Sequence, residues 1–437
     1  MNQYQLLKSR RFIPLFLTQF LGAFNDNVYK NALVILIIFQ GSTLYGLDSN
    51  ILVTLSAGIF ILPYFLFSAT AGQFADKYEK AMLIRWVKFL EVIIMSAAII
   101  GFYQKNILFL MILLFLMGAQ STLFGPLKYG ILPQHLQEHE LMGGNGMMSM
   151  GTFLAILLGT ILGGILVSIE FYGPMIVAII VVILALLGLV TSFFIPTAPA
   201  AEETLQIHWN IATQTWQTMK YALENRSVFI AILAISWFWL VGATYLSQVP
   251  AYSKDILSGN NQVVTLLLTM FSVGIGIGSI LCEKLSGGRI ELGLVPLGAI
   301  GITLFSIDIY FASQHFPQAA ALIGASDLLK IPSSWRIFLD LSLIGLFGGI
   351  YVVPLNAMIQ HRSHPQHRAR VIAANNILNA LLMVGSAIGT VLLLQLGFSI
   401  PTIFLWLGLC NIVMTLSLFL LLPEFIEHFI KWLHLVK

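Results

Sequence analysis

Long apolar runs constrain this chain more than any other feature: twelve of them alternate with polar connections. A run of about 20 apolar residues is long enough to cross the hydrocarbon core of a bilayer as an α-helix. Charged residues make up only 9% of the chain, against about 25% in a soluble domain. The sequence therefore predicts an all-α polytopic membrane protein and excludes a soluble enzyme, a disordered chain and a nucleic-acid binder. The unbroken runs also exclude a transmembrane barrel, whose strands alternate in polarity.

Hydropathy sets the predicted spans, and the longest connection between them divides six helices from six. We expect an N-terminal bundle over 1–195, a cytoplasmic linker over 196–225, a C-terminal bundle over 226–422 and a tail over 423–437. The linker has apolar residues at helical period, which predicts an amphipathic helix lying on the membrane interface or packed on protein. The spans are 12–39, 51–75, 82–103, 107–132, 141–168, 174–195, 226–251, 263–283, 292–313, 336–360, 371–397 and 400–422.

Lysine and arginine decide the orientation. They are concentrated in the N-terminal tail, in the connections after spans 2, 6, 8 and 10, and in the C-terminal tail. Cytoplasmic connections carry an excess of these residues, so both termini are predicted to be cytoplasmic. This assignment counts Lys88 with the cytoplasmic connection that follows span 2.

The two halves of the chain resemble each other at matched points. Asn145 pairs with Asn375, and Gly159-Thr160 pairs with Gly389-Thr390, at one common offset. Parallel six-helix repeats build secondary transporters of the major facilitator type, in which substrate binds near the midplane between the halves. The repeat therefore predicts a major facilitator fold with two pseudo-symmetric six-helix halves.

Particular motifs narrow the resemblance. Gly72-Gln73-Phe74-Ala75-Asp76-Lys77 resembles the major facilitator motif after span 2, although Tyr78-Glu79-Lys80 departs from its usual Gly-Arg ending. Three further segments resemble bacterial lysophospholipid transporters. They are Gln19-Phe20-Leu21-Gly22-Ala23-Phe24-Asn25-Asp26-Asn27, Gly125-Pro126-Leu127-Lys128-Tyr129-Gly130-Ile131-Leu132, and Asn145-Gly146 followed by Leu157-Leu158-Gly159-Thr160.

This resemblance implies a transporter, not an enzyme, in the bacterial inner membrane. It would move lysophosphatidylethanolamine and lysophosphatidylglycerol from the outer to the inner leaflet by alternating access with lateral entry. The implied partners are the lysophospholipid, membrane lipids and a cytoplasmic acyltransferase or acyl-activating enzyme, with no cofactor and no nucleic acid. Some family members are fused to such enzymes, and residues 423–433 resemble the bridge in those fusions.

Asp26 is the first candidate for substrate binding, together with Asn27. It lies about 21 Å into the first span, where a charge costs roughly 2.5–3.5 kcal/mol. Lys30 follows one turn later on the same face, where an ion pair can form. The repeat places the uncharged Ala243 and Ser247 opposite these two positions. Charge in one half alone favours a substrate or coupling role, and the alternative is a structural ion pair.

Lys128 follows the Gly125-Pro126 break in span 4, and its repeat counterpart is Asn356. An ammonium group there suits a phosphate, although Lys128 can instead extend to the inner interface. Trp237, Thr244 and Gln248 form an aromatic and polar face of span 7 that suits an amphiphile, or packs against other helices. Asn375 and Asn379, one turn apart in span 11, can bind a headgroup or a neighbouring helix.

Asp76 and Lys77 are predicted to act on conformation. The resemblance implies that the Asp76 carboxylate pairs with the C-terminal half and closes a cytoplasmic gate, and the alternative is an exposed pair of little effect. Glu91, a candidate protonation site, and Asp308 and Asp340 are not assigned; Asp340 lies near a span end, where solvation is one interpretation.

No metal site is predicted. The loop from His361 to Arg368 has no Cys or carboxylate and reads as a basic, solvated loop that can contact anionic headgroups. Two rival functions stay open. One is a proton-coupled exporter of a drug-like or siderophore-like molecule, with Asp26 or Glu91 as proton carrier. The other is a membrane anchor for an acyltransferase, which leaves the midplane charges unexplained.

Overall fold

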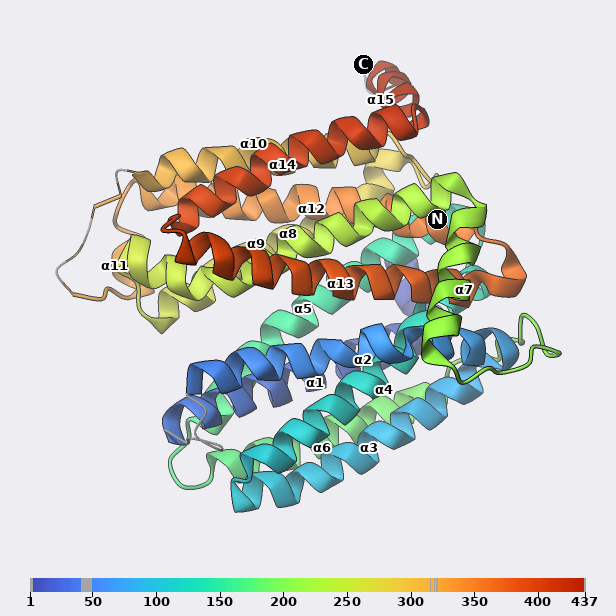
Figure 1. Ribbon diagram of the computed structural model, residues 1–437, viewed down its shortest axis with the longest axis horizontal. Helices are drawn as coiled ribbons and strands as arrows, with labels where there is room; N and C mark the ends of the chain where they lie inside the picture. The colour runs from blue at the N-terminus through green and yellow to red at the C-terminus, as the bar shows by residue number, and fades with distance from the viewer. Residues whose placement is uncertain (1–2, 41–48, 315, 318, 320, 436–437) are drawn as a thin grey trace. The chain divides into compact units, whose positions relative to one another are not determined.

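The computed structural model describes residues 3–40, 49–314, 316–317, 319 and 321–435. Twelve long helices in this part of the chain match the twelve predicted spans in order (Figure 1). They are α1 (Ile13–Gln40), α2 (Ser49–Lys77), α3 (Lys80–Gln104), α4 (Ile107–His135), α5 (Leu141–Val167), α6 (Gly173–Ser192), α8 (Arg226–Leu257), α9 (Asn261–Ser286), α10 (Leu294–Gln314), α12 (Ser334–Arg362), α13 (Arg368–Gln395) and α14 (Ile400–Leu421).

The largest error in the predicted boundaries is at the end of α8. The hydropathy pattern ends this span at residue 251, but the helix continues to Leu257 and contains Pro250. The residues beyond 251 include Ser253, Lys254 and Asp255, whose polar side chains end the hydropathy run although the backbone stays helical. Pro250 does not break the helix, because in membrane proteins neighbouring groups can satisfy the carbonyl that a proline leaves without a partner.

Ten of the twelve helices are long and apolar enough to cross a membrane, judged over the described residues. The chain is therefore a multi-pass membrane protein. The other two, α1 and α3, are 28 and 25 residues long. Both carry charged residues in their interiors, Asp26 and Lys30 in α1 and Lys88 and Glu91 in α3. Each of these two helices therefore brings both an acidic and a basic side chain into its interior.

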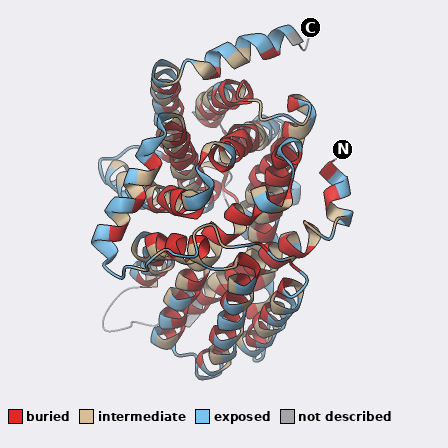
Figure 2. Cartoon of the chain, turned by 90° about the vertical axis from the view of Figure 1, so that its right-hand side faces the viewer, coloured by how far each residue is buried: buried red, intermediate tan, exposed pale blue. Residues whose placement is uncertain are grey.

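The helices group into two compact units. Unit 1 comprises Met1–Glu138, Leu154–Arg226 and Ile359–Ala380. Within it α2 packs on α4, α3 packs on α4 and α6, and α1 packs on α6. Close approach of α2 and α4 depends on Gly118, where an added Cβ would lie 2.4 Å from the Phe60 carbonyl oxygen. The buried residues of this unit form a continuous apolar core (Figure 2).

Unit 2 comprises His139–Phe153, Ser227–Met358 and Leu381–Lys437. Within it α10 packs along α14, and the terminal helix α15 (Glu424–Leu435) packs on both. The Trp432 indole fixes α15 by donating to the Leu285 carbonyl at 2.8 Å. These units are defined by packing, and the domain boundaries at residues 195 and 226 stay predictions.

A helix does form within the predicted linker, at α7 (Ile211–Glu224), with Asn210 capping its first turn. Trp216 and Leu223 are exposed on it, and its place on the membrane interface stays a prediction.

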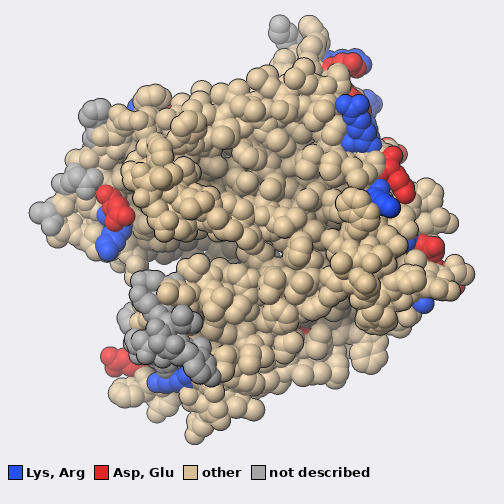
Figure 3. All heavy atoms as spheres, in the orientation of Figure 1, with Lys and Arg blue, Asp and Glu red and all other residues tan. Residues whose placement is uncertain are grey.

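Charged side chains gather near the margins of the face in Figure 3, and the surface between them is largely uncharged. The short elements are η1 (Gln3–Lys8), η2 (Glu138–Glu140), α11 (Ala325–Leu328) and η3 (Pro365–His367).

Candidate functional site

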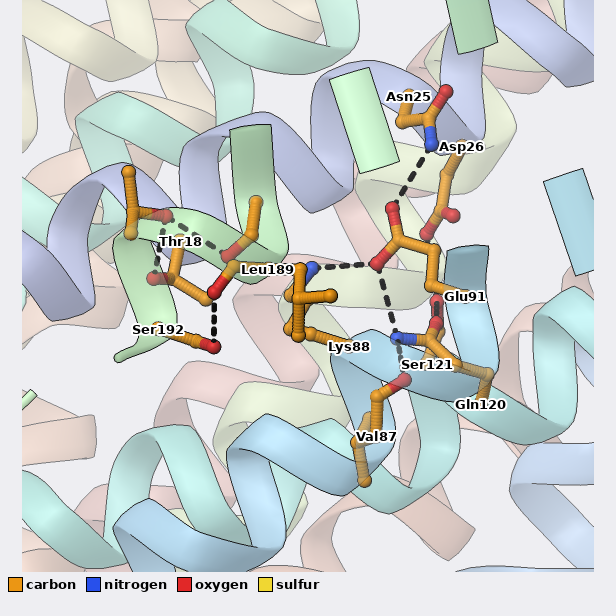
Figure 4. Close-up of polar contacts among 12 residues, drawn as sticks. Thr18, Asn25, Asp26, Val87, Lys88, Glu91, Gln120, Ser121, Leu189 and Ser192 are labelled. Atoms are coloured by element: carbon orange, nitrogen blue, oxygen red, sulfur yellow. Dashed lines mark hydrogen bonds and ion pairs between the residues drawn. The ribbon is translucent and has the colours of Figure 1, made fainter. Parts of the chain in front are cut away.

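Asp26 lies in the interior of α1 and contacts α4. Its Oδ2 atom accepts a hydrogen bond from the Ser121 hydroxyl at 2.7 Å (Figure 4). Its Oδ1 atom is buried and has no hydrogen-bond partner in the described residues. The residue as a whole is 8% exposed. A buried carboxylate oxygen without a donor is costly, so this carboxylate has capacity for one further partner.

Lys30 does not neutralise Asp26. Its ammonium group lies over the Phe60 ring of α2, 4.4 Å from the ring centre. No ion pair joins Lys30 to Asp26 within 4.0 Å in the described part of the chain, so the pair considered from sequence does not form. The amide of Asn27 donates to the Ala23 carbonyl of its own helix at 2.7 Å. One face of α1 therefore carries a carboxylate and an ammonium that are not bound to each other.

A second pair of opposite charges in unit 1 was not identified from sequence. Lys88 Nζ lies 2.7 Å from Glu91 Oε2, and both side chains are 1% exposed. Glu91 also accepts hydrogen bonds from the amides of Asn25, at 2.9 Å, and Gln120, at 3.2 Å (Figure 4). Lys88 is therefore not a residue of the cytoplasmic connection, and the assignment that counted it there is wrong. Opposite charges at i and i+3 inside an apolar run are the signal that could have revealed the pair.

Gly22 makes room for this buried lysine. A Cβ at position 22 would lie 2.4 Å from Lys88 Nζ. The small residue in the Gln19–Asn27 motif thus has a packing role on the α3 side of α1. Gln120 and Ser121 are sequence neighbours on α4, and their side chains lie 3.2 Å apart. They connect the Glu91 cluster to Asp26 through a continuous chain of polar contacts.

The remaining candidates of unit 1 lie on α4 and α13. Lys128 is half-buried with its ammonium 4.6 Å from the centre of the Tyr129 ring. Asn375 is buried, and its Oδ1 atom has no partner in the described residues. Asn379 is half-buried. The sequence did not single out Asn376, whose amide lies against Gly125, 2.6 Å from the position of an added Cβ.

The candidates of unit 2 have their polar groups engaged within that unit. The Trp237 indole donates to Asn411 of α14 at 2.7 Å. Thr244 bonds to the Leu240 carbonyl of its own helix, and Gln248 bonds to Ser247. Trp237 therefore joins α8 to α14, as a packing residue would.

Asp76, at the end of α2, binds the first turn of α13. Its carboxylate accepts backbone N–H groups of Ala369 and Arg370 at 3.0 and 3.2 Å, and the Arg370 Nε at 3.0 Å. Asp76 is fully buried, so the alternative of an exposed pair does not hold for it. Gly72 permits this approach, because an added Cβ would lie 2.9 Å from the Arg370 Cα. Lys77 takes no part and lies over the Tyr78 ring.

The linker is fastened beside this contact. Glu202 bonds to the Arg370 guanidinium, and the backbone N–H groups of Ala201 and Glu202 donate to the Asp76 carbonyl. Glu79 accepts from the Ala198 N–H at 2.6 Å while also capping α3. Gln73 exchanges hydrogen bonds with the His208 backbone. The departure Tyr78-Glu79-Lys80 from the family motif thus supplies a helix cap that also holds the linker.

Within the described ranges, no three His, Cys, Asp or Glu side chains are placed to hold a metal ion. Two histidines of the His361–Arg368 segment contact acidic side chains: Nε2 of His361 lies 3.1 Å from Oε1 of Glu138, and Nε2 of His367 lies 3.3 Å from Oε2 of Glu224.

Known proteins resemble the chain in both sequence and fold. Lysophospholipid transporter LplT of Enterobacter sp. (strain 638) is 27% identical over 386 residues, which cover 87% of this chain and 88% of that protein. LplT of Citrobacter koseri is 28% identical over 373 residues, covering 84% and 85%.

Among solved structures, the human organic anion transporter MFSD10 superposes with a TM-score of 0.73 at 13% identity, covering 94% of this chain and 99% of that one. FucP in the outward conformation gives 0.68 at 15% identity, with the same coverage. These likenesses show the fold. The sequence model described as Major Facilitator Superfamily matches residues 15–384. Because this match covers most of the sequence, the chain belongs to the major facilitator superfamily of transporters.

Proposed function

We propose that this protein transports lysophospholipids from the outer to the inner leaflet of a bacterial inner membrane, where a cytoplasmic acyltransferase re-acylates them. Two facts support the proposal. The relatives reported above are named lysophospholipid transporters and align over most of their length. The polar groups of α1 also fit the headgroup chemistry of such a substrate.

The observation that carries the proposal is the unpaired state of Asp26 and Lys30. A phosphoethanolamine headgroup has one ammonium and one phosphate, joined by a short chain. The free Oδ1 of Asp26 is an acceptor for the ammonium, and the Lys30 ammonium is a donor for the phosphate. Charge-assisted bonds of this kind replace the water that the headgroup loses inside the membrane. Lys128 is a second ammonium in unit 1 that suits the phosphate.

We infer that Asp76 gates the transport cycle. Its bonds to the first turn of α13 hold together the predicted cytoplasmic ends of α2 and α13. The negative carboxylate also suits the positive end of the α13 dipole. Alternating access by rocking of residues 1–195 against 226–422 requires a contact of this kind to break and reform.

The decisive experiment measures inward movement of labelled lysophosphatidylethanolamine in proteoliposomes. We expect movement without an imposed proton gradient in the wild type and its loss in Asp26→Ala. The matched control is Asp327→Ala, since Asp327 is an acid paired with Lys330 at the surface, and it should transport normally.

Each result has a clear meaning. Full activity of a folded Asp26→Ala protein would remove the assigned role of Asp26. A wild type that moves no lysophospholipid, with or without a gradient, would reject the lipid substrate and direct the search to soluble substrates of a proton-coupled exporter.

A further inference from the structure

A second group of charges lies in unit 2, between α10 and α12. Arg336 binds Asp308 through two hydrogen bonds, one from Nε to Oδ2 at 2.9 Å and one from its NH2 group to Oδ1. The side chains of Arg336 and Asp308 are 52% and 34% exposed. This fork geometry is the strong form of an arginine–carboxylate pair, and it satisfies Asp308 without help from Asp340.

Asp340 lies one turn after Arg336 on α12 and is 1% exposed. The solvation considered from its position near a span end is therefore wrong. Its Oδ2 atom is buried and receives no hydrogen bond from a donor in the described residues. Arg336 lies one turn away on the same helix and binds Asp308, so the carboxyl groups of Asp340 and Asp308 belong to one cluster around Arg336.

Two ionised carboxylates cannot hydrogen-bond, since each is only an acceptor. Two carboxyls in contact share a proton instead. The other groups around Asp340 do not remove this need. Arg336 is the nearby positive charge, and its fork is bound to Asp308. Tyr245 and Tyr252 approach from α8, but their hydroxyls are hydrogen-bonded to Ser306 and Ser313.

One proton corrects both the charge and the hydrogen bonding of this cluster. Two carboxylates and one guanidinium carry a net charge of minus one, and a bound proton makes the group neutral. The same proton supplies the missing donor between Asp340 and Asp308. The half-exposed Arg336–Asp308 pair gives the site contact with the surface of unit 2, from which a proton can arrive.

We propose that Asp308 and Asp340 form a proton-binding site in the C-terminal half of this transporter, with Arg336 as its fixed counter-charge. The site takes one proton from water and returns it to water, and no other group is transferred. Its existence is independent of the substrate, whereas any effect on lysophospholipid movement rests on the proposed function.

Infrared spectroscopy of the purified full-length protein tests the site directly. Protonated carboxyl groups absorb in a region free of carboxylate and amide bands, so difference spectra between about pH 5 and about pH 8 report them. We expect the wild type to show a protonated-carboxyl component that is missing from the spectrum of Asp340→Asn, whatever other buried carboxyl groups contribute. Asp308→Asn should lose it too, because an amide donor then hydrogen-bonds an ionised Asp340. Asp327→Asn is the control and should keep the band.

An unchanged band in a folded Asp340→Asn protein would overturn the proposal. If that variant does not fold, Asp340→Glu decides instead. It keeps a carboxyl group in an altered position, so the band must change frequency, and an unchanged spectrum would again overturn the site.

Transport gives the functional readout. An inward proton gradient should accelerate lysophosphatidylethanolamine movement in the wild type, and Asp340→Asn should lose that acceleration while keeping basal movement. Gradient acceleration that survives in Asp340→Asn would exclude this site from coupling. A wild type that moves no lysophospholipid would defeat the proposed function alone, because the infrared result decides the proton site without substrate.

Discussion

Unit 1 contains two pairs of opposite charges, one on α1 and one on α3, and the two pairs differ in their contacts. Lys88 and Glu91 of α3 form a contact of 2.7 Å and are fully buried. Amides of Asn25 and Gln120 complete the shell of Glu91. Asp26 and Lys30 of α1 have the spacing of an ion pair, yet Lys30 lies over Phe60 and Asp26 retains a buried oxygen without a partner.

The difference separates a structural pair from groups available to a ligand. A buried ion pair whose carboxylate oxygens all accept hydrogen bonds has no hydrogen-bonding capacity left for substrate. Removing one partner of such a pair leaves the other partner as an uncompensated buried charge. Unpaired charges in the same region cost stability and persist where they have another purpose. We therefore propose a packing role for the charge pair of α3 and a binding role for the charges of α1, and substitutions can test both proposals.

The largest effect is expected at Lys88. Lys88→Met leaves Glu91 charged and buried, which should lower the free energy of unfolding by about 3–5 kcal/mol. Lys88→Met combined with Glu91→Gln removes both charges and should recover most of the loss. Thermal unfolding in detergent measures both variants, and an equally unstable double variant would contradict the ion-pair account.

A smaller loss is expected at Gly22. Gly22→Ala places a methyl group against the Lys88 ammonium, and overpacking of this kind costs about 1–3 kcal/mol. The matched control is Gly58→Ala on α2, where an added Cβ meets no atom within 4 Å. Equal melting temperatures for the two variants would show that Lys88 moves away freely.

Ser121 links the two charge pairs and should have a moderate effect. Ser121→Ala removes the hydrogen bond donated to Asp26 and should cost about 1 kcal/mol, with slower lysophospholipid movement. Ser121→Thr keeps the hydroxyl and should restore both stability and transport. Failure of threonine to rescue transport would make Ser121 a packing residue.

The smallest change in stability is expected at Asp26, where the change in transport is greatest. Asp26→Asn keeps an acceptor for Ser121 and removes a buried charge, so the free energy of unfolding should stay within about 1 kcal/mol. Transport should be lost. A strong destabilisation, measured in the same unfolding assay as Lys88→Met, would place Asp26 with the structural pair.

The fold was predictable because its signal is repeated along the chain. Twelve apolar runs, each near the thickness of a bilayer, set the helices to within a few residues. Their ends were less certain because hydropathy measures side-chain polarity and not backbone hydrogen bonding: α8 continues through the charged residues Lys254 and Asp255.

The sequence could not predict which side chains contact each charged residue of the candidate site. Spacing makes Asp26–Lys30 and Lys88–Glu91 equally good pairs. What decides between them is which groups of other helices come near: Asn25 and Gln120 at Glu91, Ser121 at Asp26, Phe60 at Lys30. These contacts join positions up to 95 residues apart, and a periodic pattern on one helix carries no information about them.

The fastening of the linker beside Asp76 has a consequence for how conformational change can be observed. Residues 198–208 are bound to the end of α2 and the start of α3, and Glu202 shares Arg370 with Asp76. Backbone held by several hydrogen bonds resists cleavage, because proteases need a locally opened chain. A transport cycle that releases Arg370 from Asp76 also removes the side-chain contact of Glu202 with Arg370, while the backbone bonds of the segment to α2 and α3 can remain. Faster protease cleavage near Glu202 would then report the loss of this one contact.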